Sequence, residues 1–358
     1  MLDNDQLNIV MLANELYSII ATDESAVTFL KVHELLPMES EELPCERCGC
    51  EMRQVVRSKR LRDGSMREYQ TLRCTGSRCQ TYRSIRQQNP FFSYVNLNGH
   101  CHSNLSLGQI LEICYYWCLD LPQVSVAALT GRCAQAVCDW YNLCRDVCVK
   151  LFEGRDQLGG EGEVVEIDEC LLRGKRKANR GRLLLGDLKH TEAEEDSQET
   201  DNVESRRNYG RRIEGPWVFG LCSRRRNSGE VLERRFFVVE RRDRATLIPI
   251  ILREVARGTT IRSDEWGAYR GLESLGFRHE TVNHQHFFID PDTHCNTQTI
   301  ECLWSHLKMK IVRKMHGTTP LLLPRHLIEI WWRSTKGSRV KFIEFLSDIR
   351  QVHSMRTL

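Results

Sequence analysis

Residues 163–168 have the sequence Glu-Val-Val-Glu-Ile-Asp, in which β-branched residues cluster and the run stops at a carboxylate. A short apolar run of this kind is typical of a central strand that is buried on both faces of its sheet. We therefore predict a buried strand here, with Asp168 inside it or at its tip. The next residue, Glu169, is expected on the opposite face, because side chains alternate along a strand.

Two further carboxylates lie in comparable segments. Residues 258–264 form a β-rich run that begins with glycine, so Asp264 is expected at the carboxyl end of a second strand. Glu301 lies in residues 297–311, where apolar residues recur at helical spacing: Ile300, Trp304, Leu307 and Ile311. Glu301 is therefore expected beside the buried stripe of a helix, where it can face a sheet.

Carboxylates that a fold brings together repel one another and raise each other's pKa. A divalent cation removes this cost, and hard carboxylate oxygens suit Mg²⁺ or Mn²⁺. Such a site can activate a water or a 3′-hydroxyl for attack on a phosphodiester and stabilise the leaving oxygen. The order strand, strand, helix thus predicts a metal-dependent site for phosphodiester hydrolysis and strand transfer, built from Asp168, Asp264 and Glu301.

Several other motifs occur in order around these carboxylates. They are Ile-Asp-Glu (167–169), Asn-Arg-Gly (179–181), Gly-Pro-Trp-Val-Phe-Gly (215–220), Ser-Asp-x-Trp-x-x-Tyr (263–269), Val-Asn-His (282–284) and Thr-Gln-x-Ile-Glu-x-x-Trp (297–304). In these motifs the chain resembles the Merlin superfamily of DDE transposases, the eukaryotic relatives of a bacterial insertion-sequence group. The resemblance is strong over about residues 160–315 and looser toward the amino terminus.

The resemblance implies an α/β protein with an RNase-H-like catalytic domain over residues 160–350, whose mixed sheet is flanked by helices. Asp168, Asp264 and Glu301 would be its catalytic triad. It also implies a nuclear transposase that binds terminal inverted repeats in double-stranded DNA, cleaves with Mg²⁺ or Mn²⁺, joins the ends to target DNA and pairs two ends as a homo-oligomer. The alternative is a domesticated, non-catalytic DNA-binding protein derived from such an enzyme, and the intact triad favours the enzyme.

The composition is that of an ordinary soluble protein. The 358 residues are 41% hydrophobic and 28% charged, with a net charge of +3, and are enough for two or three domains. No long apolar run or basic-then-apolar leader occurs, so neither a membrane span nor a secretory signal is expected. Basic residues concentrate in two runs, ten between Arg53 and Arg86 and six in residues 173–182. Such runs can neutralise DNA phosphates, although a solvated face has the same composition.

A charged insertion over residues 183–212 departs from the resembled family, which has a short connection at this point. Residues 192–204 contain seven acidic side chains and no Lys or Arg. Such a segment cannot bury a core, so we expect a solvated loop.

Sixteen cysteines in a chain without a signal peptide indicate a reducing compartment, where thiols bind metal or pack as small hydrophobes. Two pairs flank a basic, strand-like segment: Cys45 with Cys48, and Cys74 with Cys79. Tetrahedral Cys₄ coordination suits Zn²⁺, so residues 41–90 are expected to form a zinc ribbon. Cys50 is an alternative to Cys48 but fits the knuckle geometry less well. The resemblance implies that the ribbon contacts DNA ends.

Residues 100–155 have a helical pattern, with a short helix that ends at Gly131 and a second helical run after Arg132. This order predicts a helix-turn-helix-like DNA-binding region whose second helix enters a major groove. A plain helical spacer would produce the same apolar stripes. Residues 1–40 add a helical segment that we interpret as scaffold. Six cysteines of the region are expected to be buried: Cys114, Cys118, Cys133, Cys138, Cys144 and Cys148.

Four more polar residues are candidates for the site. Asn283 and His284 end a predicted strand and would support the triad or contact DNA, although a lone histidine is more often structural. Lys308 and Lys310 lie a turn or two beyond Glu301 and can reach a phosphate as point charges, but simple exposure explains them equally well.

Overall fold

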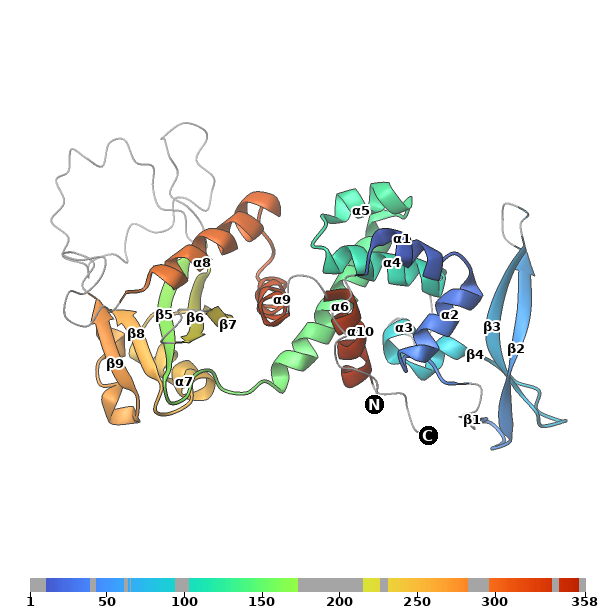
Figure 1. Ribbon diagram of the computed structural model, residues 1–358, viewed down its shortest axis with the longest axis horizontal. Helices are drawn as coiled ribbons and strands as arrows, with labels where there is room; N and C mark the ends of the chain where they lie inside the picture. Colours follow the sequence, from blue (N-terminus) through green and yellow to red (C-terminus); the bar gives the residue numbers. More distant parts are fainter. Residues whose placement is uncertain are drawn as a thin grey trace. The chain divides into compact units, whose positions relative to one another are not determined.

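The computed structural model describes residues 11–38, 43–60, 64, 66–93, 103–172, 215–225, 231–282, 296–336 and 341–353. The chain divides into two compact units. The first, here the helical unit, is Met1–Arg155 together with Thr335–Leu358, and the second, here the sheet unit, is Asp156–Ser334. Figure 1 shows the elements of both. The acidic insertion and the basic run of residues 173–182 lie outside the described residues.

The sheet unit is built on a five-stranded mixed sheet with the strand order β7-β6-β5-β8-β9. Its strands are β5 (Glu163–Leu171), β6 (Trp217–Arg225), β7 (Val231–Val239), β8 (Thr260–Asp264) and β9 (Arg278–Val282). The first three are antiparallel to one another, whereas β8 runs parallel to β5, and β9 parallel to β8. Strand β5 is therefore the centre of the sheet, and the carboxyl ends of β5 and β8 lie at one edge.

Helices cover both faces of this sheet (Figure 1). Odd-numbered residues of β5 (Val165, Ile167) pack with α7 (Arg244–Glu254) and with the segment after β8, which includes the 3₁₀ turns η5 (Gly267–Tyr269) and η6 (Glu273–Leu275). On the other face, Cys170 packs with α8 (Gln298–Lys308), its π-helical continuation η7 (Met309–Lys314) and α9 (Leu323–Thr335). Strand alternation thus divides β5 between two hydrophobic cores.

The predicted mixed sheet flanked by helices is confirmed. Both strands and the helix that carry the three carboxylates occur where their patterns predict them. Among the described helices, none is long and apolar enough to cross a lipid bilayer.

The helical unit contains a helix contributed by the carboxyl end of the chain. Helix α10 (Lys341–Val352) packs on α4 (Leu107–Cys118), where the rings of Phe345 and Trp117 lie 4.8 Å apart. The sequence places residues up to 350 in the catalytic domain, but the structure groups residues from 335 onward with the helical unit. The apolar face of α10 finds its partner far away in sequence, and a local pattern does not encode such pairing.

The expected helix, turn and helix are present in this unit. Helix α5 (Gln123–Thr130) ends at Gly131, whose φ of 65° provides a left-handed cap, and α6 (Ala134–Glu153) follows. The cysteine prediction is confirmed for Cys114, Cys118, Cys144 and Cys148, which are buried, but wrong for Cys133, which is exposed, and Cys138, which is half-buried. Cys133 is the N-cap residue of α6, and Cys138 lies in the second turn of that helix.

A small antiparallel sheet with the order β1-β2-β3-β4 lies in the amino-terminal part of the helical unit. Its strands are β1 (Leu43–Pro44), β2 (Glu51–Arg60), β3 (Met66–Cys74) and β4 (Tyr82–Ser84). The short helices around it are α1 (Ala13–Ile19), α2 (Asp23–Val32), η2 (Ile85–Gln88) and α3 (Pro90–Ser93). Lys31 of α2 donates a 2.8 Å hydrogen bond to Gln54 of β2, so one face of the hairpin is attached to α2.

Candidate active site and metal centre

Asp168 lies near the carboxyl end of β5, and the register places it level with Asp264. Glu166 pairs with Arg262 of β8, so two residues further along the parallel strands Asp168 and Asp264 reach the same level. Burial raises the pKa of Asp168 to about 6, with smaller contributions from the charges of Asp264 and Glu301. The structure therefore brings Asp264 and Glu301 within electrostatic reach of Asp168.

The loop after β8 holds Asp264 in place. The amide of Trp266 donates a 3.1 Å hydrogen bond to Asp264 Oδ1, which fixes the carboxylate at the strand end. The indole of Trp266 in turn donates a 2.9 Å hydrogen bond to the carbonyl of Arg242, and the Arg242 guanidinium lies 3.9 Å from the ring centroid of Trp217. In the Asp-x-Trp part of the motif at residues 264–266, Trp266 thus holds the Asp264 carboxylate in place.

Glu301 is in the first turn of α8, where Thr297 Oγ1 donates a 3.1 Å hydrogen bond to its Oε1. The same helix is attached to β5 by Trp304, whose Nε1 donates a 2.7 Å hydrogen bond to Asp168 Oδ2. Trp304 therefore orients the Asp168 carboxylate, a role that sequence periodicity did not reveal. The signal was present in the Glu-x-x-Trp spacing, which puts Glu301 and Trp304 on neighbouring parts of one helix face.

Gly220 makes room for the Trp304 indole. It pairs with Asp168 across β6 and β5, and a Cβ built on Gly220 would lie 2.5 Å from Cη2 and 2.7 Å from Cζ2 of Trp304. Real Cβ atoms essentially never approach ring carbons so closely. Glycine is thus required in the Trp-Val-Phe-Gly strand by the indole stacked on it.

Gly220→Ala is therefore expected to displace Trp304 and lower the free energy of unfolding by about 1–3 kcal/mol, the usual cost of overpacking a core. The Asp168 carboxylate loses its indole partner at the same time. Urea denaturation followed by tryptophan fluorescence measures the effect. Gly267→Ala is the matched control, since a Cβ there meets no atom within 4 Å, and equal stability of the two variants would contradict the prediction.

Glu169 lies on the other face of the sheet, as the alternation predicts. Its Oε1 accepts a short hydrogen bond from the hydroxyl of Tyr269, a residue of the core formed with α7. Burial raises the pKa of Glu169 to about 7, and the charges of Asp168 and Asp264 add to the rise. Sequence reasoning did not identify this Tyr269 contact, which ties the segment after Asp264 to β5.

The three carboxylates suit a divalent cation chemically. They offer carboxylate oxygens as ligands, and burial raises the pKa of Asp168 because it makes the anionic form more costly there than in water. A bound cation would offset both the burial and the mutual repulsion. Asp168, Asp264 and Glu301 are thus the residues that could hold Mg²⁺ or Mn²⁺.

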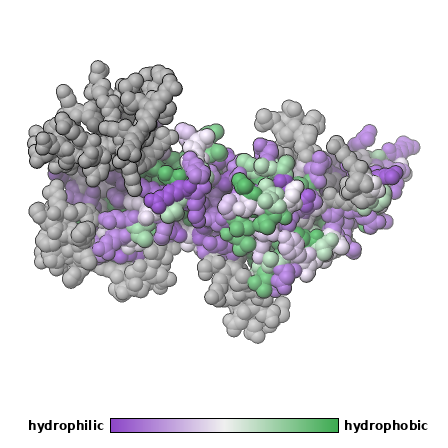
Figure 2. Space-filling view, turned by 90° about the horizontal axis from the view of Figure 1, so that it is seen from above, coloured by the Kyte–Doolittle hydropathy of each residue, from purple (hydrophilic) through white to green (hydrophobic). Residues whose placement is uncertain are grey.

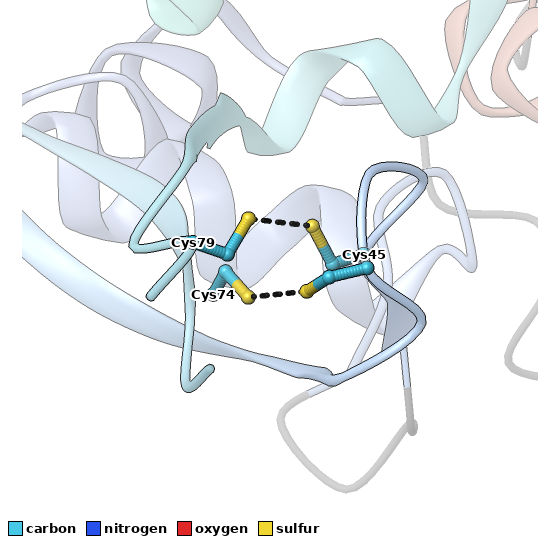
Figure 3. Close-up of side chains that lie close together, drawn as sticks. Cys45, Cys74 and Cys79 are labelled. Atoms are coloured by element: carbon cyan, nitrogen blue, oxygen red, sulfur yellow. Dashed lines mark hydrogen bonds between the residues drawn. The ribbon is translucent and has the colours of Figure 1, made fainter. Parts of the chain in front are cut away.

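The four predicted zinc ligands converge in the small sheet (Figure 3). The Sγ atoms of Cys45, Cys48, Cys74 and Cys79 all lie within 4.8 Å of one another. The Cys45–Cys79 pair is 3.8 Å apart and the Cys48–Cys74 pair 3.4 Å. A tetrahedral site with Zn–S bonds of about 2.3 Å needs sulfur atoms about 3.8 Å apart. The four thiols therefore already have nearly the spacing of a zinc site.

The two cysteine loops have the expected turns. Gly49 follows Cys48 with a φ of 71°, and its amide donates a 2.7 Å hydrogen bond to the Cys45 carbonyl. In the second loop, the amide of Gly76 donates a 3.3 Å hydrogen bond to Cys74 Sγ. Cys50 is exposed and is outside the four-sulfur group, in agreement with the preference for Cys48.

The two predicted lysines beyond Glu301 both lie near other side chains of the sheet unit. Lys310 forms a 3.5 Å ion pair with Glu329 of α9, and Lys308 lies near Cys170, lowering the pKa of that thiol against the larger effect of burial. Asn283 and His284 lie outside the described residues.

The residues around the three carboxylates match a transposase domain. Residues 157–335 fit the family model of the ISXO2-like transposase domain, and this segment is half of the chain. The chain belongs to the ISXO2-like transposase family. No curated protein matches the sequence.

Solved structures with a likeness to the chain include complexes of the Mos1 transposase. A pre-cleavage Mos1 transpososome is 10% identical, with 68% of this chain and 75% of that chain covered and a TM-score of 0.26. A Mos1 paired-end complex with the left transposon end is 12% identical over the same shares, with a TM-score of 0.27. The fold described above depends on the strand order of this chain and not on these likenesses.

Proposed function

We propose that the protein is a DDE transposase of the Merlin superfamily that binds terminal inverted repeats, cleaves DNA strands and joins the ends to target DNA. The observation that carries the proposal is that Asp264 of β8 and Glu301 of α8 lie within electrostatic reach of Asp168 of β5, inside a transposase domain. The strand order β7-β6-β5-β8-β9, with three antiparallel strands followed by two parallel ones, supports an RNase-H-like fold.

In this proposal the three carboxylates bind Mg²⁺ or Mn²⁺. When bound, the cation supplies activation of the attacking water or 3′-hydroxyl and stabilisation of the leaving oxygen. The chain's own part is to hold the ligands. Trp304 orients Asp168 through its indole N–H, Trp266 fixes Asp264 through its amide, and Thr297 donates to Glu301.

The four-cysteine group is proposed to bind one structural Zn²⁺. Among the described residues, the core that Cys45 and Cys74 join has two other buried members, Met52 and Leu72. So small a core does not stabilise a separate sheet, and a metal bound by four thiolates supplies the missing free energy.

One face of the β2–β3 hairpin is proposed as a DNA contact. Strand pairing puts Arg53, Arg57, Lys59 and Arg73 on the face opposite the one that carries Gln54 and the buried core residues, and all four are exposed. The guanidinium of Arg57 lies 4.5 Å from the ring centroid of Tyr82, and that of Arg73 lies 5.6 Å from it. In Figure 2, hydrophilic residues predominate over the described part of the hairpin, at the right of the view. Exposed cations beside an aromatic ring suit a phosphate backbone.

Arg57→Ala is expected to weaken binding to specific and random duplexes alike and to reduce the slope of log affinity against log salt by about one. The matched control is Arg60→Ala, because Arg60 lies on the same strand but on the opposite face. Fluorescence anisotropy at several salt concentrations measures both slopes in the full-length protein. An equal loss in the two variants would show that the contact does not depend on this face.

Recognition of the terminal repeats is proposed for residues 1–155, through the ribbon and the helix-turn-helix order of α5 and α6. The protein is further proposed to act in the nucleus, as a homo-oligomer that pairs two transposon ends. The functional test is cleavage of a labelled duplex carrying the inverted repeats that flank the gene, with Mg²⁺ or Mn²⁺. Binding without cleavage would favour the alternative, a domesticated DNA-binding protein.

A further inference from the structure

A fourth carboxylate, Glu166, lies fully buried on the same face of β5 as Asp168. Its Oε2 accepts a 3.0 Å hydrogen bond from the amide of Ile300 in α8. Its Oε1 lies 2.9 Å from Nε of Arg224 on β6 as an ion pair, without the alignment of a hydrogen bond. A buried carboxylate is costly unless it is paired, so these contacts explain how Glu166 is tolerated.

The contact with Ile300 completes the start of α8. The first amides of a helix have no partner within the helix, and the N-cap residue Thr297 makes no capping side-chain bond. Ile300 is the third residue of the helix, and the amide at this position normally donates a hydrogen bond to a capping side chain. Glu166 supplies that acceptor from a strand, and its negative charge suits the positive end of the helix dipole. Arg224 adds a 3.3 Å hydrogen bond from Nη1 to Thr299 Oγ1, so the same turn is held twice.

Two hydrogen bonds therefore attach α8 to β5. The distance between the two acceptors along the strand is similar to the distance between the two donor residues along the helix. Glu166 and Asp168 are two strand residues apart, which is about 6.7 Å. Their partners Ile300 and Trp304 are four helix residues apart, a rise of about 6 Å. Both contacts are present in the folded chain. Glu301 follows Ile300 directly, so the position of the attached turn decides where its carboxylate lies.

We propose that Glu166 is a positioning residue that sets Glu301 against Asp168 by capping the first turn of α8. This inference rests on the proposed function, because the site that it positions is the proposed cleavage site. Glu166 binds neither substrate nor metal in this role. It acts through the backbone of α8, together with Arg224.

The test compares Glu166→Ala and Glu166→Gln in the full-length protein. Misplacing a reacting group by about 1 Å costs roughly 100-fold in rate, so Glu166→Ala is expected to lower single-turnover cleavage at saturating DNA by that factor. The affinity for DNA should not change. Glu166→Gln keeps an acceptor for the Ile300 amide but loses the charge, so its rate should lie between those of the wild type and Glu166→Ala. Amide hydrogen exchange should be faster in the first turn of α8 in Glu166→Ala.

Glu254→Gln is the matched control for loss of a buried ion pair. Glu254 is 1% exposed and pairs with Arg235 at 2.8 Å, and it belongs to α7 on the other face of the sheet. It should lower the melting temperature without changing exchange in α8 or the cleavage rate of the folded protein. Equal rate losses in Glu166→Ala and Glu254→Gln would reduce Glu166 to a stability role and overturn the proposal.

Hydrogen exchange separates this proposal from the proposed function. If the wild type cleaves no DNA end, the proposed function is refuted. The positioning role of Glu166 is then tested by hydrogen exchange alone, and unchanged amide exchange in α8 of Glu166→Ala would refute it. If the wild type cleaves and Glu166→Ala, while folded, keeps at least half of the rate, the positioning role is refuted.

Discussion

Asp168→Asn, Asp264→Asn and Glu301→Gln are each expected to abolish cleavage of a labelled transposon-end duplex in Mg²⁺ or Mn²⁺. Each amide keeps the shape of the side chain but removes the charge that binds the cation. A metal site contributes several kcal/mol to transition-state stabilisation, so a rate loss of roughly 10³-fold or more is expected. Binding of DNA ends by the full-length variants should stay close to that of the wild type, because the proposed DNA-binding elements lie in the helical unit.

Two neighbours on β5 serve as controls for these variants. Glu163→Gln changes an acid at the start of the strand and should leave cleavage unchanged. Glu169→Gln should cost far less than Asp168→Asn, because Glu169 lies on the opposite face and accepts from Tyr269. A requirement for Glu169 as strict as that for Asp168, or full activity in any of the three triad variants, would show that the metal site is misassigned.

Cys74→Ser should have the second-largest effect, with loss of stoichiometric zinc and unfolding of the β1–β4 sheet. Structural zinc sites contribute apparent binding free energies of about 10–16 kcal/mol, which small metal-bound modules use for folding. Cys74 is 2% exposed and belongs to both the four-sulfur group and the small core, so its loss removes a ligand and a packing contact together. Elemental analysis of the purified full-length protein and hydrogen exchange over β2 and β3 measure the two effects.

Cys50→Ser is the matched control for the zinc ligands, since Cys50 is exposed, adjoins the first loop and lies outside the four-sulfur group. It should retain one zinc per chain, whereas Cys48→Ser should not. The reverse outcome would exchange the two cysteines in the ligand set. A wild-type protein that contains no zinc, or whose small sheet is unaffected by a strong chelator, would refute the ribbon altogether.

The local elements of the candidate site follow from sequence because each has a pattern that needs no distant partner. The β-branched run before Asp168 forms β5, the run before Asp264 forms β8, and the apolar stripe around Glu301 forms α8. The parallel pairing of β5 and β8 then brings the two aspartates to one sheet edge. The Cys-x₂-Cys and Cys-x₄-Cys pairs that flank the basic strand-like segment likewise predict the four sulfur atoms that converge, with Cys50 left as an alternative to Cys48, since each pair closes a local turn.

Only the tertiary structure shows which side chains hold these elements together. Glu166 appears in sequence as one acid in a strand, but its partner amide belongs to a residue 134 positions away. Gly220 likewise appears as a weak strand residue until the Trp304 ring is placed on it. Helix α10 is amphipathic in sequence, yet whether it joins the sheet unit or the helical unit is decided by which apolar surface it buries. Sequence patterns determine local conformation and the chemistry of each segment, whereas long-range contacts depend on the complementary shapes and charges that meet only in the folded chain.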